Sequence, residues 1–100
     1  MRETTIEQLE PALREGAALV DVREAAEYRE GHVPGAVNIP MGQLSTRLGE
    51  LDRDRPVLVV CASGNRSAAM TDVLTAAGYD AANVVGGTRA WIESGRPTEK

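Results

Sequence analysis

The sequence has little of what several common classes of protein depend on. Cys61 is its single cysteine, so an intrachain disulfide, a Cys-x-x-Cys redox pair and a multi-cysteine zinc site are all excluded. Phenylalanine is absent and the only aromatic residues are one Trp and two Tyr, too few for a surface on which single-stranded nucleic acid could stack. A formal net charge of −4 argues against a general binder of nucleic-acid backbones, so any selectivity for anions must be local.

Long apolar runs are also missing. No stretch approaches the length of a membrane span or of a signal-peptide core, and the first residues are polar, so we expect a cytoplasmic protein. The 100 residues suit one domain, and we expect it to span residues 1–100. Hydrophobic residues make up 42% of the chain, which is enough for an aliphatic core and argues against wholesale disorder.

What the chain does contain is a regular alternation of short apolar segments with segments of helical periodicity. Four segments are predicted to be strands: 18–22, 36–39, 57–60 and 83–85. Helical periodicity is found at 24–30, 44–51, 67–77 and around 90–92. This alternation predicts an α/β fold with a mostly parallel central sheet of about five short strands and helices on both faces, because parallel strands need crossover connections.

The N-terminal segment gives a mixed signal. Thr5 and Gln8 have the spacing of a capping box at the start of a helix. Pro11 cannot continue an interior helix without the loss of a hydrogen bond. We therefore expect a short turn here, followed by a helix that begins at Pro11 and ends at Gly16.

The chain is organised around the segment 57–67. An apolar strand ends at Cys61, and a short polar loop leads into the next helix, whose unpaired N–H groups should face the loop. A helix N-terminus and the guanidinium of Arg66 both favour a thiolate, so we predict a cysteine-centred anion site with Cys61 as nucleophile. Arg66 is an unfavourable charge in a first helical turn, which indicates that a ligand or a carboxylate compensates it. The predicted anion-binding residues are Ala62, Ser63, Gly64, Asn65, Arg66 and Ser67.

Individual residues of this segment have distinct expected roles. Gly64 lets the backbone approach the sulfur closely, and Asn65 tolerates left-handed geometry. Ser67 either caps the helix or donates a hydrogen bond to the sulfur, and both interpretations stay open. Asp21 and Arg23 follow a neighbouring strand, where we expect an ion pair that supports the loop rather than takes part in the chemistry.

Several other conspicuous residues are better explained by structure than by chemistry. His32 is the only histidine and stands in a Gly/Pro turn without Cys or His companions, so we expect a structural hydrogen bond and no metal. Trp91 is expected to anchor the last helix in the core. Glu24, Glu27 and Glu30 are read as a solvated helix face. Cys61 itself, without the loop that follows it, would be read as a buried apolar side chain.

Four segments in this order, 21–24, 31–40, 61–67 and 86–91, resemble the single-domain rhodanese family. The resemblance implies a sulfurtransferase in which Cys61 takes a sulfane sulfur from a donor such as thiosulfate or a persulfide and becomes a persulfide. The sulfur then passes to a thiophilic acceptor: cyanide, a thiol or a partner protein. Such a reaction needs no metal, nucleotide or flavin cofactor. In many members the residue after the cysteine is basic, whereas here it is Ala62, which leaves room for a donor less charged than thiosulfate.

Three alternatives remain. The domain could be a sulfur carrier or regulatory binding module with little turnover on small molecules. It could be a cysteine-dependent phosphatase or arsenate reductase, although phosphatases that share this fold resemble Cys-x5-Arg at this loop, and only four residues separate Cys61 from Arg66 here. A purely structural domain would have a thiol of ordinary pKa and form no persulfide.

Overall fold

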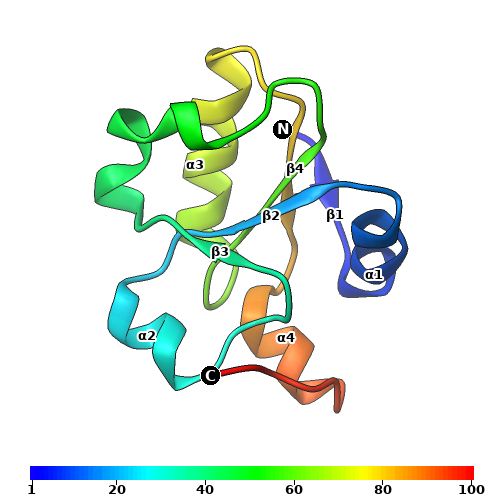
Figure 1. Ribbon diagram of the computed structural model, residues 1–100. Helices are drawn as coiled ribbons and strands as arrows, with labels where there is room; N and C mark the ends of the chain where they lie inside the picture. The colour runs from blue at the N-terminus through cyan, green and yellow to red at the C-terminus, as the bar shows by residue number, and fades with distance from the viewer.

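The computed structural model describes residues 1–100 and contains one sheet of five short strands. The strands are β1 (Glu3–Thr4), β2 (Ala18–Asp21), β3 (Val37–Asn38), β4 (Val57–Val60) and β5 (Ala81–Val84). All pairings are parallel and the order across the sheet is β1-β5-β4-β2-β3, with β4 at the centre (Figure 1). Because parallel strands end at the same edge of a sheet, the carboxyl ends of β2, β4 and β5 lie together there.

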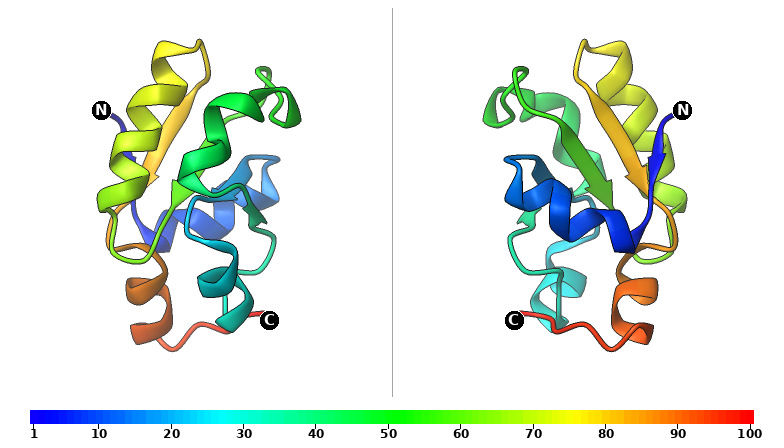
Figure 2. Two further views of the ribbon diagram at one scale, coloured as in Figure 1. Left: turned by 90° about the vertical axis from the view of Figure 1, so that its left-hand side faces the viewer. Right: turned by 90° about the vertical axis from the view of Figure 1, so that its right-hand side faces the viewer.

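Four α-helices and two short 3₁₀-helices connect the strands. They are α1 (Ile6–Arg14), α2 (Ala25–Glu30), η1 (Met41–Thr46), η2 (Leu48–Glu50), α3 (Asn65–Ala76) and α4 (Gly87–Glu93). One face of the sheet is covered by α1 with Trp91 of α4, and the other by α3, η1 and η2 (Figure 2). The predicted α/β class, with a parallel sheet and helices on both faces, is confirmed. None of the helices is long and apolar enough to cross a membrane.

The position of β4 in the middle of the sheet explains why residues 57–60 form a continuous apolar run. Val57 and Val59 pack into the cluster that contains Leu74 of α3, whereas Leu58 and Val60 pack into the cluster on the α1 side. All four side chains are buried. A strand covered on both faces has no side chain that faces water, so polar residues do not alternate along it.

The first helix differs from the prediction. Thr5 caps α1 through the expected capping box with Gln8, but the helix runs unbroken through Pro11 and no turn precedes that residue. Pro11 costs one internal hydrogen bond. The buried side chains of Ile6 and Leu9 hold this helix against the sheet, and packing of an apolar face supplies most of the stability of a short helix.

The segment 44–51 is also different, since it forms two 3₁₀-helices instead of one α-helix. Leu48 and Leu51 are three residues apart, which is the repeat of a 3₁₀-helix. The break falls at Arg47, and the Tyr79 hydroxyl donates a hydrogen bond to the Leu48 carbonyl at 2.8 Å.

Other elements differ from the prediction in their presence or in their bounds. β1 was not predicted, because two polar residues at the edge of a sheet carry no apolar pattern. β5 begins at Ala81, and the exposed Val85 lies outside it. α3 begins at Asn65, two residues before the predicted start at Ser67.

Candidate active site

Cys61 directly follows β4, at the carboxyl edge of the sheet and at its centre. The residue is only 1% exposed and its sulfur lies under the loop that leads into α3. Gly64 is the N-cap of α3 and has a φ of 109°. Glycine adopts this left-handed conformation without strain. Ser63 and Asn65 are exposed on the outside of the loop.

Two hydrogen-bond donors of this segment lie within reach of the Cys61 sulfur. The Gly64 N–H donates to Sγ at 3.1 Å and the Ser67 hydroxyl lies 3.2 Å from Sγ. Burial alone raises the pKa of the Cys61 thiol, but the hydrogen bonds from the Ser67 hydroxyl and from the N–H groups of Ser67, Gly64 and Ser63 outweigh it. The pKa therefore lies below its ordinary value, as a nucleophilic thiolate requires. Of the two roles considered for Ser67, the hydrogen bond to sulfur is present.

Asn83 of β5 is hydrogen-bonded to Ser67 and was not identified as a site residue from the sequence. Its Oδ1 lies 2.6 Å from the Ser67 hydroxyl and its Nδ2 donates to the Gly64 carbonyl at 3.3 Å. The Ser67 hydroxyl has one proton, so it donates to Asn83 while the thiol is protonated and must turn toward Sγ when Cys61 is a thiolate. The signal available in the sequence was a single polar residue inside an otherwise apolar segment. The structure shows that this residue is buried, where a polar side chain needs a hydrogen-bond partner.

The start of α4 fixes the other side of the loop. The Thr88 N–H donates to the Cys61 carbonyl at 2.8 Å and the Arg89 N–H to the Ala62 carbonyl at 3.0 Å. Gly87 makes this approach feasible, because a Cβ at this position would lie 2.5 Å from the Cys61 carbonyl oxygen. The loop is thus held between α3 and α4.

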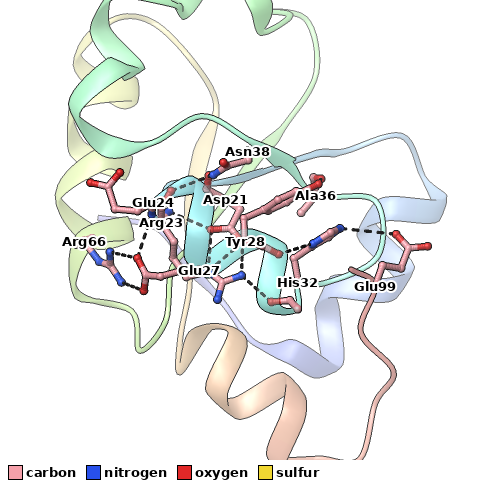
Figure 3. Close-up of polar contacts among 11 residues, drawn as sticks. Asp21, Arg23, Glu24, Glu27, Tyr28, His32, Ala36, Asn38, Arg66 and Glu99 are labelled. Atoms are coloured by element: carbon pink, nitrogen blue, oxygen red, sulfur yellow. Dashed lines mark hydrogen bonds and ion pairs between the residues drawn. The ribbon is translucent and has the colours of Figure 1, made fainter.

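Arg66 lies in the first turn of α3, and the structure places its guanidinium against a carboxylate instead of leaving it free for a donor. Its Nη1 and Nη2 donate to Oε1 and Oε2 of Glu27 at 2.8 and 3.0 Å (Figure 3). The hydrogen bonds from Arg66 lower the pKa of Glu27 to about 2, although partial burial of the carboxylate acts in the opposite direction. A hydrogen bond from the Glu24 N–H lowers the pKa further. The reading of Glu27 as part of a solvated helix face is therefore wrong, whereas the inference that a carboxylate compensates Arg66 is confirmed.

Asp21 and Arg23 form the expected ion pair at the end of β2, buried at the carboxyl edge of the sheet (Figure 3). Arg23 Nη2 donates to Asp21 Oδ2 at 2.8 Å and to the Gly31 carbonyl at 2.9 Å. Asn38 Nδ2 donates to both the Asp21 and Arg23 carbonyls at 2.9 Å. This network fixes the position of the turn after α2, and so the position of Glu27 relative to the loop.

His32 and Trp91 have structural surroundings. The His32 ring stacks on Tyr28 with centroids 3.6 Å apart, and its Nδ1 donates to the Tyr28 carbonyl at 2.9 Å. Trp91 is 3% exposed in the core and its Nε1 donates to the Pro97 carbonyl at 2.6 Å. No group of three or more His, Cys, Asp or Glu side chains is arranged to hold a metal ion.

A cavity of about 400 Å³ opens next to the loop, on the side of α4. Ala62 contributes one wall and Ile92 another, and Thr88 lines it as well. The Thr88 hydroxyl is buried without a hydrogen-bond partner. The remaining lining residues are charged: Arg23, Arg89 and Glu93.

A cysteine in a loop at the carboxyl edge of a parallel sheet is an arrangement that can be compared with known protein families. Residues 5–94 match the family model of the rhodanese-like domain. The chain belongs to the rhodanese family.

Relatives and solved structures that resemble this domain are known. The candidate sulfurtransferase YtwF of Bacillus subtilis is 39% identical over 79 residues, which cover 79% of this chain and 77% of that protein. The candidate sulfur carrier protein YrkF of the same organism is 37% identical over 78 residues, which cover 77% of this chain and 42% of that protein. A rhodanese-related protein from Thermoplasma volcanium has a structure that superposes with a TM-score of 0.92 at 34% identity, over 99% of this chain and 98% of the other. These likenesses support a role in sulfur transfer.

Proposed function

We propose that this rhodanese is a sulfurtransferase that carries the transferred sulfur as a persulfide on Cys61. The observation that supports the proposal most strongly is the pair of donors on Sγ, the Gly64 N–H and the Ser67 hydroxyl, which favour the thiolate at a buried position. The same donors suit the persulfide that follows, since its terminal sulfur is also an anion.

The first half of the reaction loads the cysteine. The Cys61 thiolate attacks the outer sulfur of the donor, a bond forms between Sγ and that sulfur, and the bond to the rest of the donor breaks. With thiosulfate the leaving group is sulfite; with a persulfide it is a thiolate. The N–H groups of Ser63, Gly64 and Ser67 are directed at the sulfur. The Asp21–Arg23 ion pair holds the turn after α2 through the Gly31 carbonyl.

The second half unloads the cysteine onto an external acceptor. The chain has no second cysteine, so the persulfide cannot be resolved within it. A cyanide ion, a small thiol or a cysteine of a partner protein attacks the terminal sulfur, and the Cys61 thiolate is regenerated as the leaving group.

The test is intact-protein mass spectrometry of the reduced protein after treatment with thiosulfate and, separately, with glutathione persulfide. We expect a gain equal to one sulfur atom, its absence in Cys61→Ser, and its removal by cyanide. Failure to gain sulfur from both donors, with a thiol that remains open to alkylation, would contradict the proposal.

A sulfur-carrier role is the second candidate, and the likeness to YrkF favours it. A carrier would form the persulfide stoichiometrically but turn over slowly with cyanide or small thiols. Turnover and stoichiometric loading measured on the same preparation separate the two roles.

A further inference from the structure

Two of the three arginines near the Cys61 loop, Arg66 and Arg23, are compensated by carboxylates. Arg66 makes two parallel hydrogen bonds to Glu27, an arrangement that holds a guanidinium firmly. Arg23 is buried in its ion pair with Asp21. Neither guanidinium is therefore free, and the remaining arginine, Arg89, is exposed without an ion pair and lines the cavity on the side of α4.

This charge arrangement matters for the choice of sulfur donor. Thiosulfate is a dianion and must approach an anionic thiolate, so its binding depends on nearby positive charge. The residue after the nucleophile, Ala62, supplies none. The hydrogen bonds that Arg66 donates to Glu27 are the main cause of the raised pKa of the guanidinium, and the nearby thiolate of Cys61 raises it further. Arg66 could therefore attract an anionic donor, but Glu27 competes for it.

We propose that Glu27 is a positioning residue which holds Arg66 and so makes the site selective for organic persulfides over dianionic thiosulfate. The inference rests on the proposed function of Cys61. The Cys61 thiolate attacks the outer sulfur of the persulfide R–S–SH, the new Sγ–S bond forms and the S–S bond of the donor breaks. The thiol R–SH leaves with the proton, and the negative charge stays on the Cys61 persulfide.

The cavity beside the loop supports a donor with an organic body. Its volume of about 400 Å³ is far larger than a sulfonate group needs. Ala62 and Ile92 contribute apolar side chains to a lining that is otherwise polar or charged. The Thr88 hydroxyl has no partner within the protein, which leaves it able to bond a polar group of the ligand after a rotation of its side chain. A carbon chain attached to the outgoing sulfur can lie in this cavity.

The experiment compares two donors of nearly the same shape. Methanethiosulfonate has a methyl group where thiosulfate has a charged oxygen, so it carries one negative charge fewer and releases methanesulfinate instead of sulfite. The rate constant for loading of Cys61 is followed by intact mass for each donor and for glutathione persulfide. This readout does not depend on turnover and serves a transferase and a carrier equally well.

Three proteins give the expected pattern: the wild type, Glu27→Gln and Glu30→Gln. Glu30 lies on the same helix but forms no ion pair, so its variant controls for the loss of one negative charge. The wild type should load faster from methanethiosulfonate and glutathione persulfide than from thiosulfate. Glu27→Gln should raise the thiosulfate rate about tenfold and the methanethiosulfonate rate by about threefold or less, because the freed charge acts more strongly on a dianion. Glu30→Gln should leave the ratio of the two rates unchanged.

Two further variants separate charge from folding. Glu27→Asp keeps the negative charge and should keep the wild-type ratio of rates. Glu27→Gln combined with Arg66→Gln should lose the gain on thiosulfate, since that gain depends on the freed guanidinium. A loss of folding would lower the loading rates for all donors together and would leave their ratio unchanged.

The outcomes distinguish this inference from the proposed function. If Cys61 loads from every donor but Glu27→Gln leaves the ratio of rates within about twofold of the wild type, the role of Glu27 is wrong and the sulfurtransferase proposal stands. If the wild type loads from none of the three donors, the proposed function itself is wrong.

Discussion

Ser67 links the nucleophile to the core of the protein. Its hydroxyl lies 3.2 Å from the Cys61 sulfur and 2.6 Å from Asn83 Oδ1, and the residue is completely buried. Asn83 belongs to a strand and Ser67 to a helix, so both residues are held in place by regular secondary structure. Together they fix the position of the hydroxyl group next to the Cys61 sulfur.

Replacement of Ser67 by alanine tests this arrangement. Ser67→Ala removes a donor that favours the thiolate, so the pKa of Cys61 should rise and loading with sulfur near neutral pH should slow by roughly tenfold. The absorbance of the thiolate, followed as a function of pH, measures the pKa change directly. Ser63→Ala is the matched control, because Ser63 contributes only its backbone N–H and should titrate like the wild type.

Glu27 predicts a dependence of stability on pH. Its pKa is about 2 in the folded protein against an ordinary value of 4.5, so the ionised carboxylate stabilises the fold above pH 4.5 and that contribution is lost as the pH falls toward 2. Both side chains of the pair are about one-third exposed, at 34% and 35%, so solvent screening reduces the contribution. We expect about 1 kcal/mol or less.

Urea unfolding near pH 7 and again near pH 3 measures this contribution. The free energy of unfolding should fall more between the two pH values in the wild type than in Glu27→Gln. Glu30→Gln should behave like the wild type, and an equal fall in all three proteins would rule out the ion pair as the source.

Among the elements, α4 packs directly against the active loop. Gly87 has φ of 61° and lies against the Cys61 and Ala62 carbonyls, where an added Cβ would come within 2.5 and 2.7 Å of the oxygens. The contact fixes the loop backbone through the N–H groups of Thr88 and Arg89.

Gly87→Ala should therefore displace α4 from the loop. We expect a loss of about 3 kcal/mol or more in the free energy of unfolding, from backbone strain together with the steric clash, and slower loading of Cys61. Gly95→Ala is the control, since Gly95 also has a positive φ of 85° but no atom within 4 Å of the added Cβ. If the two variants lose equal stability, the loss is due to backbone conformation alone and the contact does not matter.

The order of the elements was predictable from the sequence because it depends on local patterns. The buried strand at 57–60 and its cysteine, the helix closed by Gly31 and the capping box at Thr5 all follow from residues within a few positions of one another. Pro11 was misread because tertiary packing outweighs the loss of one hydrogen bond.

The supporting contacts of the site were less accessible to sequence reasoning. Glu27 and Arg66 are separated by 39 positions, and Ser67 and Asn83 by 16. Nothing in the local pattern distinguishes Glu27 from its neighbours Glu24 and Glu30. Only the approach of α2 to the start of α3 shows which of the three carboxylates meets the arginine.

At the scale of the whole molecule, the C-terminal segment connects α4 back to the turn after α2. His32 and Glu99 exchange two backbone hydrogen bonds of 2.9 Å, and Pro97 accepts the hydrogen bond from Trp91 Nε1. The segment after α4 thus covers His32 and the edge of the core at Trp91.

Removal of residues 97–100 should lower the free energy of unfolding by about 2–3 kcal/mol, since three hydrogen bonds are lost and the Trp91 N–H is uncovered. Chemical denaturation of the shortened protein measures the effect. Removal of Lys100 alone is the control, because this residue contributes to none of the three bonds. Equal stability of the shortened and full chains would show that the segment does not contribute to the fold.

The parallel pairing of β1 with β5 has a consequence for the order in which the molecule is made. Glu3 pairs with Asn83, so β1 leaves the ribosome before the strand it pairs with, and this edge of the sheet closes only after β5 has been synthesised. Cys61 is synthesised before Asn83, the residue that orients the Ser67 hydroxyl. It is also synthesised before α4, whose N–H groups fix the loop after Cys61. The hydrogen bonds that lower the pKa of this cysteine are therefore complete only once β5 and α4 have folded onto the loop.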